Sequence, residues 1–155
     1  MSLSAFLQAG GIHRDVPSAE VPSLLERVVR AIPGADEAAL GALVDRLRAP
    51  GGVSWAPVGD GLALPHLRAR APLGSGSGVI AILFLRDAIT AAGPAPDGVP
   101  VTRLLFFVAP TPTAHLQMLG RLSAAILRGD LRCAMLDAAS DESIIAAIAR
   151  ATPFR

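Results

Sequence analysis

VIAILFL, at residues 79–85, and VTRLLFFV, at residues 101–108, are two short runs of apolar, β-branched and aromatic residues bounded by turn-forming residues. Runs of this length and composition are typical of β-strands. Both runs are almost continuously apolar, so we expect the strands to be buried on both faces, with helices above and below the sheet. A further strand is predicted within residues 53–64.

Helices are predicted before these strands in the sequence. In residues 18–32 the apolar side chains recur every three or four residues, which is the period of one helix face. A second helix is expected to begin after Asp36, whose side chain suits an N-cap, and to end before Pro50. Both helices would cover the sheet.

The last third of the chain returns to helical patterns. Thr111-Pro112 is a helix start, with an N-cap threonine and a proline in the first helical position. Two shorter helices are expected to begin at Asp130 and Ser140. The packed face of the first of these three helices is predicted to carry Leu116, Leu119, Ser123, Ile126 and Leu127. The order of elements predicts an α/β protein, a three-layer α/β/α sandwich with a mixed β-sheet in a single domain.

The composition excludes several classes of protein. The chain of 155 residues suffices for one domain, and 52% apolar against 17% charged residues is a globular composition. A net charge of +1 gives no general attraction to nucleic acid or to an anionic membrane. All 14 basic side chains are arginine, which excludes chemistry based on a P-loop lysine or a Schiff-base lysine.

Several features favour a protein of the reducing cytoplasm that does not insert into a membrane. The longest apolar runs are far shorter than the ~20 residues that a membrane-spanning helix needs. The first residues lack the basic and apolar regions of a secretory signal. The single Cys133 cannot form an intramolecular disulfide, and we predict that it is a small buried residue.

The three histidines are the main candidates for chemistry. Pro65 fixes its own φ and favours an extended Leu64, so the imidazole of His66 would be held at a strand end with limited backbone freedom. There it could attack phosphorus or a carbonyl carbon if its other nitrogen keeps the proton. The alternative is a histidine that only ends a strand. His115 lies in the opening turns of a helix, where anions bind, but a solvent-facing polar residue is the favoured interpretation. His13 is interpreted as an ordinary surface residue.

Three arginines could supply positive charge to a phosphate bound at His66, because guanidinium groups pair with phosphate oxygens: Arg48, Arg68 and Arg70. The alternative is that they are only solvated. The glycine-serine run at residues 74–78 precedes a strand and not a helix, so we predict a flexible turn rather than a nucleotide loop. The spacing of the histidines and the cysteine does not match a structural metal site.

Three pieces of the sequence together resemble a known family: VGDGLALPH at residues 58–66, DGVPV at residues 97–101, and His115-Leu116 with Leu119 at a helix start. The resemblance is to the fructose/mannitol and nitrogen-regulatory type, type 2, of enzyme IIA in the bacterial phosphoenolpyruvate-dependent phosphotransferase system. It covers residues 4–152. The sequence departs from the family at residues 49–52, where a Glu usually follows an arginine, and at residues 55–59, where the family has Ser/Thr-x-Ile-Gly.

The resemblance implies a phosphotransferase that carries a phosphoryl group on His66. The group would come from a phosphohistidine of the small carrier HPr, or of its nitrogen-branch relative, without a metal or an organic cofactor. His115 and Arg48 match family residues that hold the phosphoryl group, and Arg68 would add positive charge.

Docking of the carrier would need an apolar surface near His66. We expect Leu62, Leu67 and Trp55 to supply it and the contact to be small and transient. The phosphoryl group would then pass to a IIB domain or act on a regulatory target protein, in sugar uptake or in nitrogen regulation. The alternative function is a regulatory interaction module of the same fold that binds a transporter or a kinase, with phosphorylation as a switch or absent.

Overall fold

Two strands, β5 (Val79–Ile89) and β6 (Val101–Val108), form the middle of a mixed sheet in the computed structural model, which describes residues 2–69, 72–74 and 77–151. Both predicted strands are therefore confirmed, and β5 extends four residues beyond the predicted run. The other elements, in chain order, are α1 (Leu3–Gly10), β1 (Ile12–Val16), the short 3-10 helix η1 (Ser18–Glu20), α2 (Val21–Arg30), α3 (Glu37–Arg48), β2 (Pro57–Gly59), β3 (Leu62–Ala63), β4 (His66–Leu67), α4 (Pro112–Arg128), α5 (Asp130–Leu136) and α6 (Asp141–Ala151).

The sheet has the strand order β1-β5-β6-β3-β2, and β4 also pairs with β6. β5 and β6 are antiparallel, whereas β1 runs parallel to β5, and β3 and β4 run parallel to β6. β6 therefore has β5 along one edge and the two short strands β3 and β4, one after the other, along the other edge. This pairing determines the register of the chain around His66.

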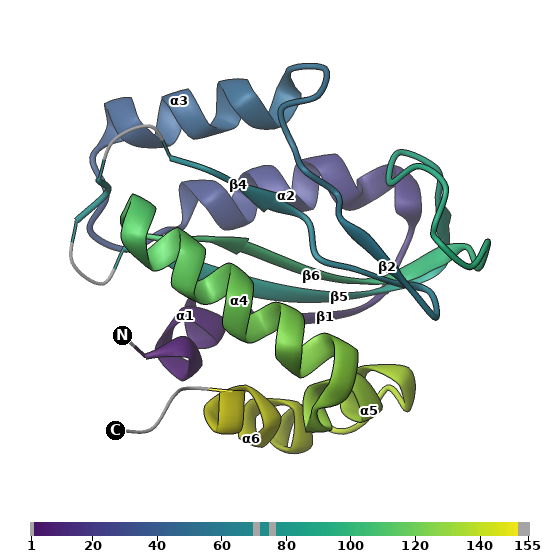
Figure 1. Ribbon diagram of the computed structural model, residues 1–155. Coiled ribbons are helices and arrows are strands. Elements are labelled where there is room, and N and C mark those ends of the chain that lie inside the picture. Colours follow the sequence, from purple (N-terminus) through teal and green to yellow (C-terminus); the bar gives the residue numbers. More distant parts are fainter. Residues whose placement is uncertain (1, 70–71, 75–76, 152–155) are drawn as a thin grey trace.

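Side chains of the central strands alternate between two apolar cores. Val79, Ala81 and Leu83 face the upper core with α2 and α3, and the intervening residues of β5 face the lower core with α1, α4, α5 and α6. Figure 1 shows the two helical layers, with α2 and α3 above the sheet. The expected three-layer α/β/α sandwich with a mixed sheet is confirmed, because strands buried on both faces need a helical layer on each.

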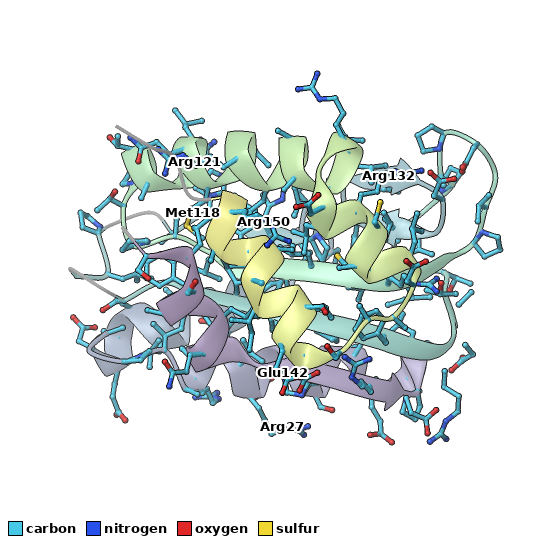
Figure 2. The ribbon with its side chains drawn as sticks, turned by 90° about the horizontal axis from the view of Figure 1, so that it is seen from below. Arg27, Met118, Arg121, Arg132, Glu142 and Arg150 are labelled. Atoms are coloured by element: carbon cyan, nitrogen blue, oxygen red, sulfur yellow. The ribbon has the colours of Figure 1, made fainter. Side chains whose placement is uncertain are left out.

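The lower layer is made by helices from both ends of the chain. Figure 2 shows this layer from below, with α6 lying between α1 and α4. Met118 on α4 is fully buried in the lower core, and Arg150 on α6 donates to an Asp130 carboxylate oxygen at 2.6 Å. Within the part of the chain that the structure describes, no helix combines the length and apolar character that crossing a membrane requires.

The predicted helix starts are confirmed by their capping bonds. The Asp36 side chain accepts from the backbone N–H of Ala39 at 2.7 Å, and the Thr111 hydroxyl accepts from the N–H of Ala114 at 3.0 Å. The pattern in residues 18–32 corresponds to η1 followed by α2, and the two shorter helices are α5 and α6.

The single strand predicted within residues 53–64 is wrong, because these residues contain the β2–β3 hairpin. Gly59, Asp60 and Gly61 all have positive φ, at 98°, 56° and 78°, which allows the chain to reverse within three residues. The Asp97 carboxylate accepts from the backbone N–H of Asp60 at 2.8 Å and from that of Val99 at 3.1 Å, so it ties this turn to the loop before β6.

One prediction about a single residue is corrected as well, because Cys133 is exposed on α5 and not buried. His13 lies in β1, a strand that was not predicted from the sequence, and its Nε2 lies 2.8 Å from the carbonyl oxygen of Gly10. The glycine-serine turn predicted at residues 74–78 falls partly on residues 75–76, which lie outside the described part of the chain.

Candidate functional site

His66 is held by backbone hydrogen bonds on both sides of β4. Its N–H donates to the Ser54 carbonyl at 2.9 Å, and its carbonyl accepts from the N–H of Ser54 at 3.2 Å. On the other side, the N–H of Phe107 donates to the Pro65 carbonyl at 3.2 Å, in the parallel pairing of β4 with β6. This backbone is therefore fixed between two neighbouring segments, as the position after Pro65 led us to expect.

The imidazole of His66 is half-buried, and its hydrogen bond defines its tautomer. Nδ1 lies 2.8 Å from the carbonyl oxygen of Leu64. A carbonyl oxygen can only accept, so Nδ1 must carry the proton. In the neutral ring Nε2 then has the free electron pair, which is the state that a nucleophilic imidazole requires.

His115 is the second histidine of the site and is almost fully buried, with 3% of its surface exposed. The favoured interpretation of a solvent-facing residue is therefore wrong. The predicted packing face of α4 is wrong in part: Ile126 is buried as predicted, but the helix also buries His115, Met118 and Leu122, and Leu127 is exposed. Leu116, which was assigned to the packed face, is 63% exposed.

Three rings meet on the lower face of the sheet. The ring of His66 stacks on that of Phe107, with centroids 5.3 Å apart and planes 21° apart. The ring of His115 lies 5.4 Å from that of His66 and 5.4 Å from that of Phe107. Sequence reasoning did not select Phe107, because nothing in an apolar strand marks the one residue that pairs in register with a histidine 41 positions earlier.

Burial lowers the pKa of His115, and the positive charges of a protonated His66 and of Arg68 lower it further. The ring of His115 is therefore neutral at neutral pH. Its Nδ1 is buried without a hydrogen-bond partner among the described residues. An unpaired buried polar atom is unfavourable, and it leaves His115 with hydrogen-bonding capacity next to His66.

The arginines differ in their positions. Arg68 is exposed two residues after His66, and its charge acts on His115. The guanidinium of Arg48 instead makes two hydrogen bonds to the carboxylate of Glu26 on α2, at 2.9 and 2.8 Å. Among the hydrogen bonds and ion pairs of the described residues, Arg48 contacts neither histidine. Arg70 lies outside the described residues.

Two of the three residues expected to form the docking surface are in the cores. Leu62 and Leu67 are each 1% exposed, Leu62 in the lower core and Leu67 in the upper core. The prediction that they contact a partner is wrong, because a side chain enclosed by packed neighbours offers no surface. Trp55 is half-buried and packs against the upper core. Leu116 is the exposed apolar side chain next to His115 in the sequence.

Solved structures share this fold. The chain is similar to the nitrogen regulatory protein IIA-Ntr from Neisseria meningitidis, with 22% identity, a TM-score of 0.57, and coverage of 94% of each chain. It is also similar to IIA mannitol from Escherichia coli, with 12% identity, a TM-score of 0.58, and coverage of 91% of this chain and 97% of that one. At these identities, the similarity establishes the fold alone. A search of curated proteins finds no significant match.

The sequence pattern of the family described as phosphoenolpyruvate-dependent sugar phosphotransferase system, EIIA 2, matches residues 37–151. The chain belongs to this family. The resemblance found in the sequence is thereby confirmed, and family membership supports a phosphocarrier role in the phosphotransferase system.

Proposed function

We propose that this protein is a phosphocarrier that accepts a phosphoryl group on Nε2 of His66 from a phosphohistidine of HPr or of its nitrogen-branch relative. The observation that carries this proposal is the 2.8 Å contact between Nδ1 of His66 and the Leu64 carbonyl oxygen. In the neutral form of the ring, this contact leaves the free electron pair on Nε2. Family membership supports the class of reaction.

In the proposed reaction, the Nε2 electron pair of His66 attacks the phosphorus atom of the donor phosphohistidine. The P–N bond of the donor breaks as the new P–N bond forms, and the donor imidazole keeps the electron pair of the broken bond. The phosphoryl group arrives already activated, so catalysis consists of positioning and of stabilising charge on the phosphoryl oxygens. The backbone bonds that fix His66 supply the positioning.

His115 and Arg68 are the residues that we assign to the phosphoryl oxygens. The neutral ring of His115, 5.4 Å from that of His66 between centroids, can donate one N–H to a phosphoryl oxygen. The guanidinium of Arg68 adds a positive charge near the same rings. Arg48 would have to leave Glu26 before it could take part, so we assign it no role in the resting protein.

Docking of the donor carrier is assigned to the surface around Leu116 in place of Leu62 and Leu67. Leu116 follows His115 directly and has 63% of its surface exposed, which suits a small and transient contact. From His66 the phosphoryl group would pass to a IIB domain or act on a regulatory target protein. A donor chain that starts from phosphoenolpyruvate operates in the cytoplasm, and we assign the protein to that compartment.

The proposal is tested by incubating the protein with phosphoenolpyruvate, enzyme I and HPr, or the nitrogen-branch counterparts, and measuring its intact mass. The wild type and His13→Gln should gain one phosphoryl group, and His66→Gln should gain none. His13 is a matched control because it lies in β1, away from the three rings. Phosphorus NMR of the product should show a phosphohistidine substituted at Nε2.

Two results would contradict the proposal. One is an unmodified wild type in a mixture whose HPr is demonstrably phosphorylated. The other is an equal gain of mass in His66→Gln, which would assign the phosphoryl group to a different residue.

A further inference from the structure

Ser54 is paired with His66 on the side of β4 that faces away from β6. The two residues form an antiparallel bridge in which each N–H donates to the other's carbonyl oxygen, at 2.9 and 3.2 Å. Side chains of directly paired residues lie on the same face of a sheet, with Cβ atoms about 4.5–5.5 Å apart. The pairing therefore places the Ser54 side chain beside the imidazole of His66.

The neighbours of Ser54 in the chain show independently which face its side chain occupies. Val53 and Trp55 both pack against the upper core. Side chains alternate between the two faces along an extended segment, so the Ser54 side chain lies on the lower face. The ring of His66 lies on this face too, where it stacks on Phe107 of the lower core.

His66 therefore has two different paired neighbours on the lower face. Phe107 pairs with it from β6 and stacks on its ring, and a phenyl side chain has no hydrogen-bond donor. Ser54 pairs with it from the other side and carries a hydroxyl, which can donate one hydrogen bond. Of these two neighbours, only Ser54 can donate to an oxygen of a phosphoryl group on His66.

The Ser54 hydroxyl and Nε2 of His66 are both available for a new contact. Ser54 is exposed, and its hydroxyl makes no hydrogen bond to another described residue. Nε2 of His66 also has no hydrogen-bond partner among the described residues, and it keeps surface open to solvent. No hydrogen bond between described residues therefore has to break before the hydroxyl can reach a phosphoryl group on Nε2.

We propose that Ser54 binds the phosphoryl group, with its hydroxyl donating a hydrogen bond to a phosphoryl oxygen during and after transfer to Nε2 of His66. This inference rests on the proposed function and adds a residue to it. A charged acceptor makes such a bond about twice as strong as one between neutral groups. Together with His115 and Arg68, the phosphoryl oxygens then have donors from three separate parts of the chain.

The test adds the phosphoryl group chemically, so that it does not depend on a carrier protein. With phosphoramidate as the donor, the bond from Nε2 to phosphorus forms, the P–N bond of the reagent breaks, and ammonia leaves. The intact mass of the full chain follows the rate. All proteins carry His13→Gln, which removes the histidine of β1 as a second acceptor. The gain of mass that His66→Gln lacks is the gain at His66.

Substitutions at position 54 separate the hydroxyl from the shape of the side chain. Ser54→Val should lower the rate at His66 about tenfold, because a hydrogen bond to a charged group is lost. Ser54→Thr has nearly the shape of the valine variant but keeps the hydroxyl, so it should react like the parent protein. Ser23→Ala should also react like the parent, because Ser23 is an exposed serine of α2 in the other helical layer. Circular dichroism reports whether each variant is folded.

Phosphorus NMR gives a second measurement, on the finished phosphohistidine. A hydrogen bond donated to the phosphoryl oxygens favours their more negative form, so it lowers the pKa of the phosphoryl group. A pH titration followed by the phosphorus shift should therefore give a higher pKa in Ser54→Val than in Ser54→Thr. A serine that only holds the backbone in place would produce no such difference.

The proposal is overturned if folded Ser54→Val is phosphorylated as fast as Ser54→Thr, or if the phosphoryl groups of the two variants titrate alike. It is also overturned if phosphoramidate does not modify His66 in the parent, because Nε2 is then not open to a phosphoryl group. A failure of the phosphocarrier proposal gives a different result, in which His66 reacts with phosphoramidate but not with phospho-HPr.

Discussion

The ring centroids of His66 and His115 lie 5.4 Å apart, with the ring planes tilted by 59°, although 49 positions separate the two residues in the sequence. His66 comes from a strand of two residues and His115 from the second turn of α4. Phe107 of β6 contacts both rings, so the sheet and the helix together determine their separation. A buried neutral histidine beside the proposed nucleophile has consequences that can be measured.

The first prediction concerns pH and stability. Burial lowers the pKa of His115 below its ordinary value of 6.5, so the unfolded chain binds a proton at higher pH than the folded chain does. The stabilising contribution of neutral His115 is thus complete above pH 6.5 and is lost as the pH falls from there through the folded pKa. Urea unfolding is measured above and below pH 6.5. The free energy of unfolding should fall less on acidification in His115→Gln than in the wild type. An equal fall in the two proteins would contradict a lowered pKa of His115.

The second prediction concerns docking. Leu116→Gln should raise the KM for phospho-HPr about tenfold, because an apolar contact of ~1–2 kcal/mol is removed. Leu127→Gln is the matched control, since Leu127 is also on α4 and 49% exposed but lies three turns away. Both variants should unfold like the wild type. If the two variants transfer phosphoryl groups equally well, the surface around Leu116 is not the docking site.

The third prediction concerns the helix that carries His115. Thr111→Ala removes the hydroxyl that accepts from the Ala114 N–H, and the free energy of unfolding should fall by about 1 kcal/mol. Thr111→Ser keeps the oxygen and should restore most of that stability. Chemical denaturation measures both values. An equal loss in the two variants would show that the cap oxygen is not responsible.

The fourth prediction compares two glycines, one within α3 and one in the turn that follows it. Gly52→Ala should lower the free energy of unfolding by about 1–3 kcal/mol, because its Cβ would overlap the Arg46 carbonyl oxygen. Gly41→Ala, in the middle of α3 with open space around it, should raise that free energy by about 0.5–1 kcal/mol. Thermal and urea unfolding measure both effects. A tolerated Gly52→Ala would show that the turn can move away from α3.

The elements that were predicted correctly are those whose pattern is local. The apolar runs of β5 and β6 and the cap of α3 at Asp36 depend on neighbouring residues in the chain. The β2–β3 hairpin was missed because its reversal depends on three consecutive positive φ values, one of them at a non-glycine residue, Asp60. β1 was missed because three of its five residues, His13, Arg14 and Asp15, are polar, and the last two of these are exposed.

Of the candidate site, the sequence by itself selected His66 as the proposed nucleophile, because Pro65 fixes its own φ and favours an extended residue before it, so that His66 follows at a strand end. Tertiary structure decided the rest. It buries His115, stacks Phe107 on His66, and places Leu62 and Leu67 in the cores instead of on a docking surface. The physical reason is that α4 carries apolar residues on more than one face, such as Leu116 and Met118. Which face is buried depends on the free energy of packing against the whole sheet, and no local pattern contains that information.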